Sequence, residues 1–237
     1  MQHFRTILFY LLAGSAAAAQ IPLPQTLQAA QPVQPVNLTD HGTLRILTNS
    51  QLMGTERFDI EPAGSGYRLK GDLRVKLPNG TDINESAVLN VDSDLHVLSY
   101  TRLQKSPKKA SVQVDFAAGI AKAHYVIPND GAKDYQYMLE SGMVILDTNF
   151  FDHFALLVGR YDFNKGGAQH IQVFIPQQAS PGMMLVEYKG KDANTGLDEL
   201  VAKTDAVEIH IWCDAGRRLQ RLAVPAAKVE IVRDTKN

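Results

Sequence analysis

The sequence GYRLKGDLRVKLPNG (residues 66–80) decides the fold class of this chain. Apolar and basic residues alternate along residues 66–77, and a period of two places successive side chains on opposite faces of a β-strand. The strand then meets Pro78-Asn79-Gly80, which is a strong turn signal because Asn-Gly accommodates the positive φ values of a tight hairpin. The stretch therefore predicts an amphipathic strand that enters a β-hairpin.

The same alternation recurs on both sides of this hairpin and predicts roughly ten to twelve short strands in all. Turn residues separate the strands, and the rhythm of parallel βαβ units is not seen. We therefore expect a mainly β fold, in which an antiparallel meander forms a curved sheet or half-barrel. The clearest further strands are residues 44–48, 87–91, 96–101, 111–116, 122–127, 168–175, 183–188, 207–213, 219–224 and 229–233.

Residues 147–161 break this pattern and predict one helix. Asp147 or Asn149 can serve as its N-cap, because Asp and Asn side chains accept hydrogen bonds from the first N–H groups of a helix. The segment is apolar around much of its circumference, so we expect the helix to pack against the sheet as a lid. Leu197 to Ala202 predicts a second, short helical turn. One face of the main helix is formed by Phe150, Phe154, Leu157 and Tyr161.

The N-terminus has the pattern of an export signal. In residues 1–19 a short basic start precedes an apolar run that is too short to span a bilayer, and Ala17 and Ala19 fit the small-residue rule for cleavage. Residues 20–42 are rich in Pro and Gln and predict a flexible leader. We therefore expect a signal peptide, this leader and a single β-rich domain over residues 43–237. The mature chain is expected in the periplasm or outside the cell, and not to span a membrane.

Composition excludes several classes of function. The chain has 45% hydrophobic residues, which is too many for a disordered protein, and its net charge of -1 argues against a nucleic-acid binder. The single cysteine, Cys213, alternates in phase with Val207, Ile209 and Ile211, so it is expected to be a buried thiol. Sequence motifs of common catalytic sites are missing, and the histidines are scattered without ligand spacing. We expect neither a metal nor a cofactor.

Asp147, Asp152 and His153 form the nearest approach to a catalytic group. In a catalytic interpretation, Asp152 could orient His153, or Asp147 could tune the basicity of His153, for general acid–base catalysis. In a structural interpretation, Asp147 caps the helix and Asp152 complements the positive end of the helix dipole. His153 then points to solvent or bonds a loop carbonyl. Adjacent residues on a helix point about 100° apart, so Asp152 and His153 are not expected to pair directly.

Four stretches of the chain carry a family resemblance: residues 66–69, 91–95, 147–161 and 211–219. Through them the body of the chain resembles periplasmic proteins with a LolA-like curled antiparallel sheet and a helical plug, and also uncharacterised exported bacterial domains of this architecture. The resemblance implies a concave apolar surface that holds a lipid or acyl chain, and it carries over no catalytic residues.

These observations predict an exported, non-enzymatic protein that binds a hydrophobic molecule, such as a lipid, or an envelope protein in the concavity of its sheet. One alternative is a hydrolase with an acid–base site near Asp147, Asp152 and His153. The other is a protein-interaction scaffold that offers an edge strand to its partner. The residues expected to line a ligand site are Phe151, Phe154, Leu157, Met183, Tyr188 and Trp212.

Overall fold

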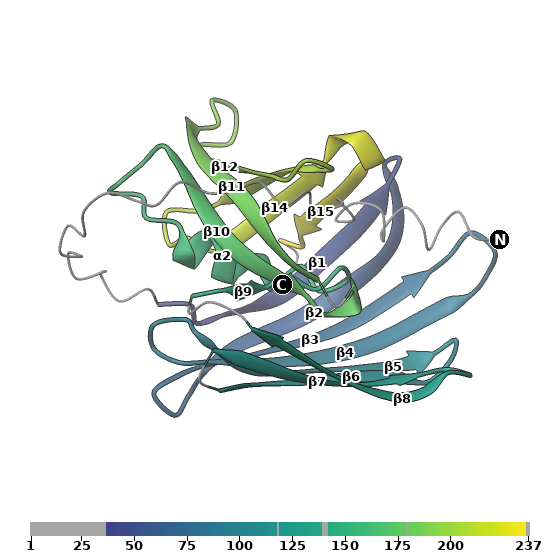
Figure 1. The fold of residues 1–237 in the computed structure, drawn as a ribbon. Coiled ribbons are helices and arrows are strands. Elements are labelled where there is room, and N and C mark those ends of the chain that lie inside the picture. Colours follow the sequence, from purple (N-terminus) through teal and green to yellow (C-terminus); the bar gives the residue numbers. More distant parts are fainter. Residues whose placement is uncertain (1–36, 118, 139–141, 179, 236–237) are drawn as a thin grey trace.

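The computed structural model describes residues 37–117, 119–138, 142–178 and 180–235 (Figure 1). The predicted signal peptide and most of the predicted leader lie outside the described residues. Within them, strands account for 63% of the chain, and a single α-helix is present. The predicted mainly β class, with an open curved sheet and one helix, is confirmed.

Fifteen strands of the described chain form one sheet that does not close. Its order is β8-β7-β6-β5-β4-β3-β2-β1-β15-β14-β13-β12-β11-β10-β9. The strands before β1 in this order are β8 (Gly131–Met138), β7 (Ile120–Ile127), β6 (Ala110–Ala117), β5 (Val97–Ser106), β4 (Asp82–Val91), β3 (Gly66–Lys76) and β2 (Gln51–Ala63). The strands from β1 onward are β1 (Asp40–Thr48), β15 (Val229–Arg233), β14 (Leu219–Val224), β13 (Glu208–Cys213), β12 (Asp198–Lys203), β11 (Ser180–Lys191), β10 (Ala168–Ile175) and β9 (Val144–Ile145).

The strands that come first and last in the chain, β1 and β15, therefore lie side by side inside the sheet. The two edge strands, β8 and β9, come from the middle of the chain. β1 pairs with both β2 and β15, and its first residue, Asp40, accepts two hydrogen bonds from the guanidinium of Arg233. Leu38 is also buried, so the folded part begins inside the stretch expected to be leader. All pairings are antiparallel except that of β9 with β10.

The hairpin predicted at Asn79-Gly80 joins β3 to β4. Gly80 has a φ of 83°, a conformation that glycine adopts at little cost, and its N–H donates to the carbonyl of Leu77. Asn79 does not share the positive φ but accepts a hydrogen bond from the N–H of Thr81. The alternation upstream places Leu69 and Leu73 in the core and the charged side chains of β3 outside.

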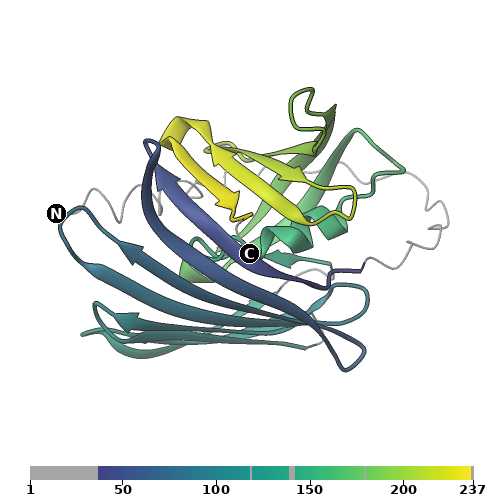
Figure 2. The same cartoon turned by 180° about the vertical axis from the view of Figure 1, so that it is seen from behind.

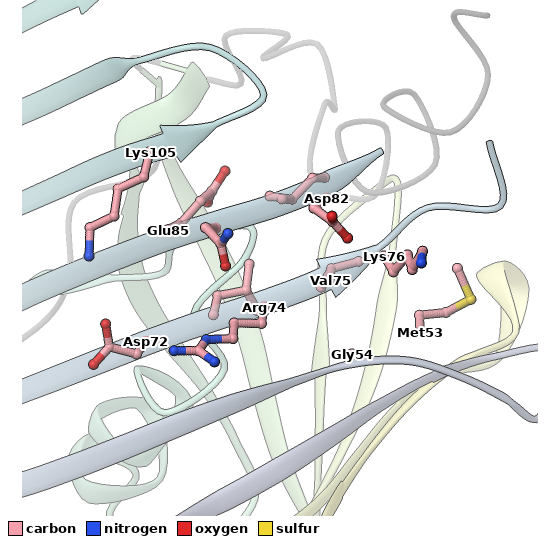
Figure 3. A pocket seen from close by; sticks show the side chains of 12 residues that line it. Met53, Gly54, Asp72, Arg74, Val75, Lys76, Asp82, Glu85 and Lys105 are labelled. Carbon is pink, nitrogen blue, oxygen red and sulfur yellow. The ribbon is translucent and has the colours of Figure 1, made fainter. Parts of the chain in front are cut away.

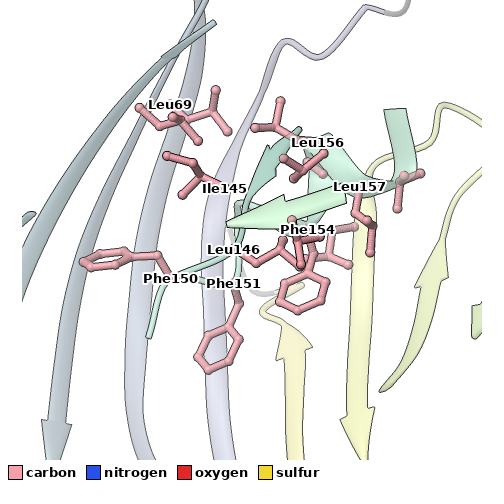
Figure 4. Packing of buried hydrophobic residues seen from close by; sticks show 14 of the residues in the cluster. Leu69, Ile145, Leu146, Phe150, Phe151, Phe154, Leu156 and Leu157 are labelled. Carbon is pink, nitrogen blue, oxygen red and sulfur yellow. The ribbon is translucent and has the colours of Figure 1, made fainter. Parts of the chain in front are cut away.

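The concave side of the sheet is filled by residues 142–161. This segment leaves β9, turns through residues 151–153 and forms α2 (Phe154–Arg160), which lies inside the curl in both views (Figures 1 and 2). Figure 4 shows its side chains converging with Leu69 of β3. Its fully buried apolar residues are Val144, Ile145, Leu146, Phe150, Leu156, Leu157 and Val158.

Two helix predictions differ from the structure. α2 begins only at Phe154, and its N-cap position is His153, without a side-chain capping bond, so neither Asp147 nor Asn149 caps it. The predicted helical turn at Leu197–Ala202 lies instead mostly within β12, where it pairs with β11 and β13. Two short 3-10 turns, η1 (Pro176–Gln178) and η2 (Pro225–Ala227), follow β10 and β14.

Candidate functional site

The segment before α2 is anchored by a buried glutamate on the inner face of β2. The carboxylate of Glu56 accepts hydrogen bonds from the backbone N–H of Phe151 at 2.8 Å and of Asp152 at 3.2 Å. These two N–H groups belong to the turn before α2, and a buried backbone N–H group must find a hydrogen-bond acceptor. Glu56 supplies that acceptor from another part of the chain.

Asp147 is held by the inner face of β5. The Tyr100 hydroxyl donates a short hydrogen bond to the Asp147 carboxylate, and Nε of Arg102 lies 3.9 Å from the same oxygen. The other oxygen of Asp147 accepts from the N–H of Asn149 at 2.8 Å. Burial, followed by the charge of Asp147, raises the pKa of Tyr100 well above its usual value, so the phenol remains a donor.

Arg102 also forms a two-bonded pair with Glu85 of β4. Its Nε and Nη2 lie 3.1 Å and 2.7 Å from the two carboxylate oxygens, the fork geometry that suits arginine. Asn149 donates to the same glutamate at 2.8 Å. Burial alone lowers the pKa of Arg102, but the carboxylates of Asp147 and Glu85 outweigh it and hold the pKa above its usual value. The guanidinium therefore stays charged.

The buried cluster contains more acid than base. Glu56, Glu85, Asp147 and Asp152 are all buried, and Arg102 is the one arginine among the described buried residues. Burial, followed by the charge of Asp152, raises the pKa of Glu56 well above its usual value. Neither carboxylate oxygen of Asp152 has a hydrogen-bond donor. A proton retained on Glu56 supplies that donor and removes one negative charge from the cluster.

His153 is enclosed and does not point to solvent, contrary to the structural reading of the sequence. Its ring contacts those of Tyr100 and Phe150, with centroids at 5.8 Å and 6.0 Å, and only 1% of the residue is exposed. Nδ1 has no hydrogen-bond partner, and Nε2 lies 3.9 Å from Asp152 Oδ1. The structure thus brings Asp147, Asp152 and His153 into one buried cluster, away from the positions that a substrate could reach from solvent.

Sequence reasoning missed Glu56, Glu85 and Arg102, although a signal for them exists. Each is a charged residue at an inward position of a strand, in phase with buried neighbours such as Phe58 on β2 or Leu89 on β4. A charge in that phase is costly unless it is paired, so it marks a buried polar contact. The pattern does not show the partners, since Glu56 contacts the distant residues 151–152, and Glu85 and Arg102 contact residues 147–149 as well as each other.

The six residues predicted to line a ligand site do not meet around one cavity. Phe151, Phe154 and Leu157 are buried in the core. Tyr188 lies beside the end of α2, where its hydroxyl donates to Asp198 at 2.8 Å. Met183 is exposed, whereas its neighbour Met184 is fully buried, so Met183 faces away from the core.

Trp212 is on the outer face as well, opposite the inward Ile211. It stacks on His210 with centroids 5.7 Å apart and is covered by the guanidinium of Arg221 at 4.4 Å. His210 in turn lies between the carboxylates of Glu199 at 2.7 Å and Glu208 at 2.9 Å. The layered side chains account for the burial of Trp212 without a ligand.

Three of the open pockets on the described surface are lined by other residues than the six predicted ones. One of about 570 Å³ lies over β3 and β4, with Asp72, Arg74 and Lys105 around it (Figure 3). The others, of about 400 Å³ and 390 Å³, lie over β6–β8 and over β1–β2. Their lining is rich in polar side chains, whereas a site for a hydrophobic molecule is mainly apolar. A ligand inside the curl would have to displace residues 142–161.

The edge strand β8 is the most accessible part of the sheet. No other described strand pairs with the side opposite β7. Tyr135 is 44% exposed and Met138 91% exposed, and Ile120 and Val126 on β7 are exposed beside them. At the other edge, β9 has only two residues, and both are fully buried. The sheet therefore has one edge that a further strand could join.

The described residues contain no cluster of metal-ligating side chains and no helix that could span a membrane. No group of three or more His, Cys, Asp or Glu residues there could hold a metal ion. Across the same residues, none of the helices has the length and apolar character needed to cross a membrane.

Comparison with known proteins agrees with the fold. A crystal structure of a β-barrel-like protein of the domain of unknown function DUF1849, from Brucella abortus, is similar with a TM-score of 0.55 and 10% identity. The match covers 84% of this chain and 96% of that one. A DUF1089 family protein from Pseudomonas aeruginosa is 14% identical, with a TM-score of 0.44, over 73% and 90% of the two chains. Neither a family model nor a curated protein matches the sequence.

The fold thus defines this chain as a domain built on one open, curved β-sheet, and it is similar in fold to the Brucella protein. At this level of identity the likeness concerns the fold alone.

Proposed function

We propose that the protein is an exported, non-enzymatic binding protein that recognises a partner protein along the free edge of β8. The observation that supports this most directly is the exposed, unpaired strand itself, since an extended segment of another chain can add to such an edge through main-chain hydrogen bonds. The pattern of residues 1–19 supports export.

The filled concavity also supports protein binding over the binding of a hydrophobic molecule. Residues 142–161 occupy the space that a lipid would need, and they are held there by the polar contacts of Glu56, Glu85, Tyr100 and Arg102. The same enclosure argues against a hydrolase at His153, because a general base must come within hydrogen-bond reach of its substrate.

Site-specific photo-crosslinking in the cells that produce the protein tests the proposal. A photoreactive phenylalanine analogue is placed at Met138 on β8 and, as a control, at Leu52 on β2, which is 55% exposed. We expect a discrete crosslinked protein product from position 138 and none from position 52. No product at 138, or the same products at both positions, would contradict the proposal.

A further inference from the structure

β8 has features of a strand that pairs with its own copy. We propose that two molecules join through antiparallel pairing of their β8 strands, with Tyr135 opposite Tyr135 of the second copy. This inference rests on the proposed function, because it names the partner that the free edge receives. The pairing would continue the sheet of one molecule into that of the other, with a twofold axis at Tyr135.

The faces of β8 limit the registers that such a pair can take. Lys133, Tyr135 and Tyr137 share one face, and Asp134, Gln136 and Met138 share the other, as the pairing with β7 shows. Directly opposed residues in an antiparallel pair point to the same side. A continuous sheet therefore allows only registers in which residues of like face oppose one another.

Charge selects among these registers. A twofold axis at Lys133 or Asp134 places that residue opposite its own copy, and like charges directly opposite are destabilising. An axis at Gln136 opposes Asp134 to the apolar Met138. An axis at Tyr135 avoids all of these contacts, because Lys133 then faces Tyr137 and Asp134 faces Gln136.

The same register also matches the apolar residues of the two molecules. Ala132 pairs with Val126 within one molecule, and Met138 pairs with Ile120. An axis at Tyr135 brings Ala132 opposite Met138 of the second copy. At each end of the contact between the two β8 strands, four apolar side chains then form a row across the sheet. They are Val126 and Ala132 of one molecule, followed by Met138 and Ile120 of the second copy. This row would cover Met138, which is 91% exposed in the single chain.

The charges on β8 do not protect the edge in the way that unpaired charges often do. Lysines and other charged residues on an edge strand commonly prevent pairing with another sheet. Here Lys133 forms an ion pair with Asp130, and Asp134 lies 2.7 Å from Nδ1 of His124. Both charged groups have partners within their own chain, and β8 contains no proline.

Sedimentation equilibrium tests the register. It is measured for the purified wild type and for two variants that place opposite charges at position 135. The wild type is expected to dimerise, and Tyr135→Lys and Tyr135→Glu are each expected to weaken dimerisation by more than about tenfold, because position 135 faces itself. Mixing the two variants should restore a dimer of one copy of each. Met183→Lys, at an exposed apolar residue on β11, should dimerise as the wild type does.

The circular dichroism spectrum and thermal midpoint of each variant establish that it is folded. A wild type that stays monomeric at every concentration, or folded Tyr135 variants that fail to form the mixed dimer, would overturn the self-pairing. If the crosslink from Met138 then joins a different protein, self-pairing is wrong and the proposed function stands. If Met138 gives no crosslink, both are wrong.

Discussion

Glu56 caps the segment that contains Phe151, although the two residues are 95 positions apart in the chain. The glutamate lies on the inner face of β2, and the N–H of Phe151 donates to its carboxylate from the turn before α2. This contact ties the filling of the curved sheet to the sheet itself. Together with the contacts of Tyr100, Arg102 and Glu85, the contact explains why residues 142–161 stay in the concavity of the sheet.

Replacement of Glu56 should weaken the fold. Glu56→Ala leaves two buried N–H groups, those of Phe151 and Asp152, without an acceptor, and we expect a loss of about 2–4 kcal/mol in the free energy of unfolding. Glu56→Gln keeps one acceptor for the N–H groups and, like the protonated glutamate, a donor toward Asp152, so its loss should be about 1 kcal/mol. Urea denaturation at neutral pH measures both. Equal losses for the two variants would show that the carbonyl acceptor is unimportant.

The stability of the protein should depend on pH through Glu56. Its pKa is raised in the folded state from the usual value of 4.5, so the folded chain keeps a proton that the unfolded chain has lost. Stability from this group is therefore full below pH 4.5 and is lost as the pH rises toward the raised pKa. The free-energy difference between the wild type and Glu56→Gln, measured by urea denaturation from pH 4 upward, should fall along this range. If the free energies of unfolding of the wild type and Glu56→Gln change with pH in parallel, the pH dependence does not come from Glu56.

Removal of Arg102 should be more damaging than removal of an exposed arginine. Arg102→Ala leaves the buried carboxylates of Glu85 and Asp147 without their cation, and we expect a loss of about 3–5 kcal/mol. Arg74→Ala, on the outer face of β3, should change stability by less than about 0.5 kcal/mol. Thermal and urea unfolding of the two variants make the comparison. Similar small losses for both would mean that the buried pair contributes little.

A methyl group at Gly71 should displace Phe150. A Cβ at Gly71 would lie 2.5 Å from Cδ1 of Phe150, a distance that requires the ring or the strand to move. We expect Gly71→Ala to cost about 1–3 kcal/mol. Gly182→Ala is a matched control, since its Cβ would meet only Cγ2 of Val173 at 3.8 Å. Equilibrium denaturation should separate the two variants, and an unchanged stability of Gly71→Ala would contradict the packing described here.

The thiol of Cys213 should be unreactive in the folded protein. Cys213 is fully buried, and burial raises its pKa to about 12, so little thiolate forms near pH 8. A disulfide reagent such as DTNB should label the chain only after urea unfolds it. Rapid labelling of the folded protein would show that Cys213 is reached from solvent.

The local pattern of the sequence predicts the strands but not their neighbours. Alternation predicts that Leu73 faces inward and that Ile211 and Trp212 lie on opposite faces, and the Asn-Gly turn signal predicts the hairpin at Gly80. Alternation carries no information on the pairing of β1 with β15, because that contact joins the two ends of the described chain.

The start of α2 also lay beyond local reasoning. Asp147 and Asn149 have side chains that often cap helices. Here, however, Asp147 accepts a hydrogen bond from Tyr100, and Asn149 donates one to Glu85. The acceptor for the N–H groups of the turn comes instead from β2. An acceptor supplied by a distant strand leaves no spacing signal near the turn.

Residue-resolved hydrogen exchange across β8 in the assembled state tests the central proposal most directly, because strand pairing protects backbone amides as well as side chains. Half of the amides of Gly131–Met138 should point away from β7, since N–H groups alternate in direction along a strand. We expect these outward amides to exchange rapidly in the isolated chain and slowly once the partner strand is bound. Outward amides that still exchange rapidly in a formed complex would contradict strand addition at β8.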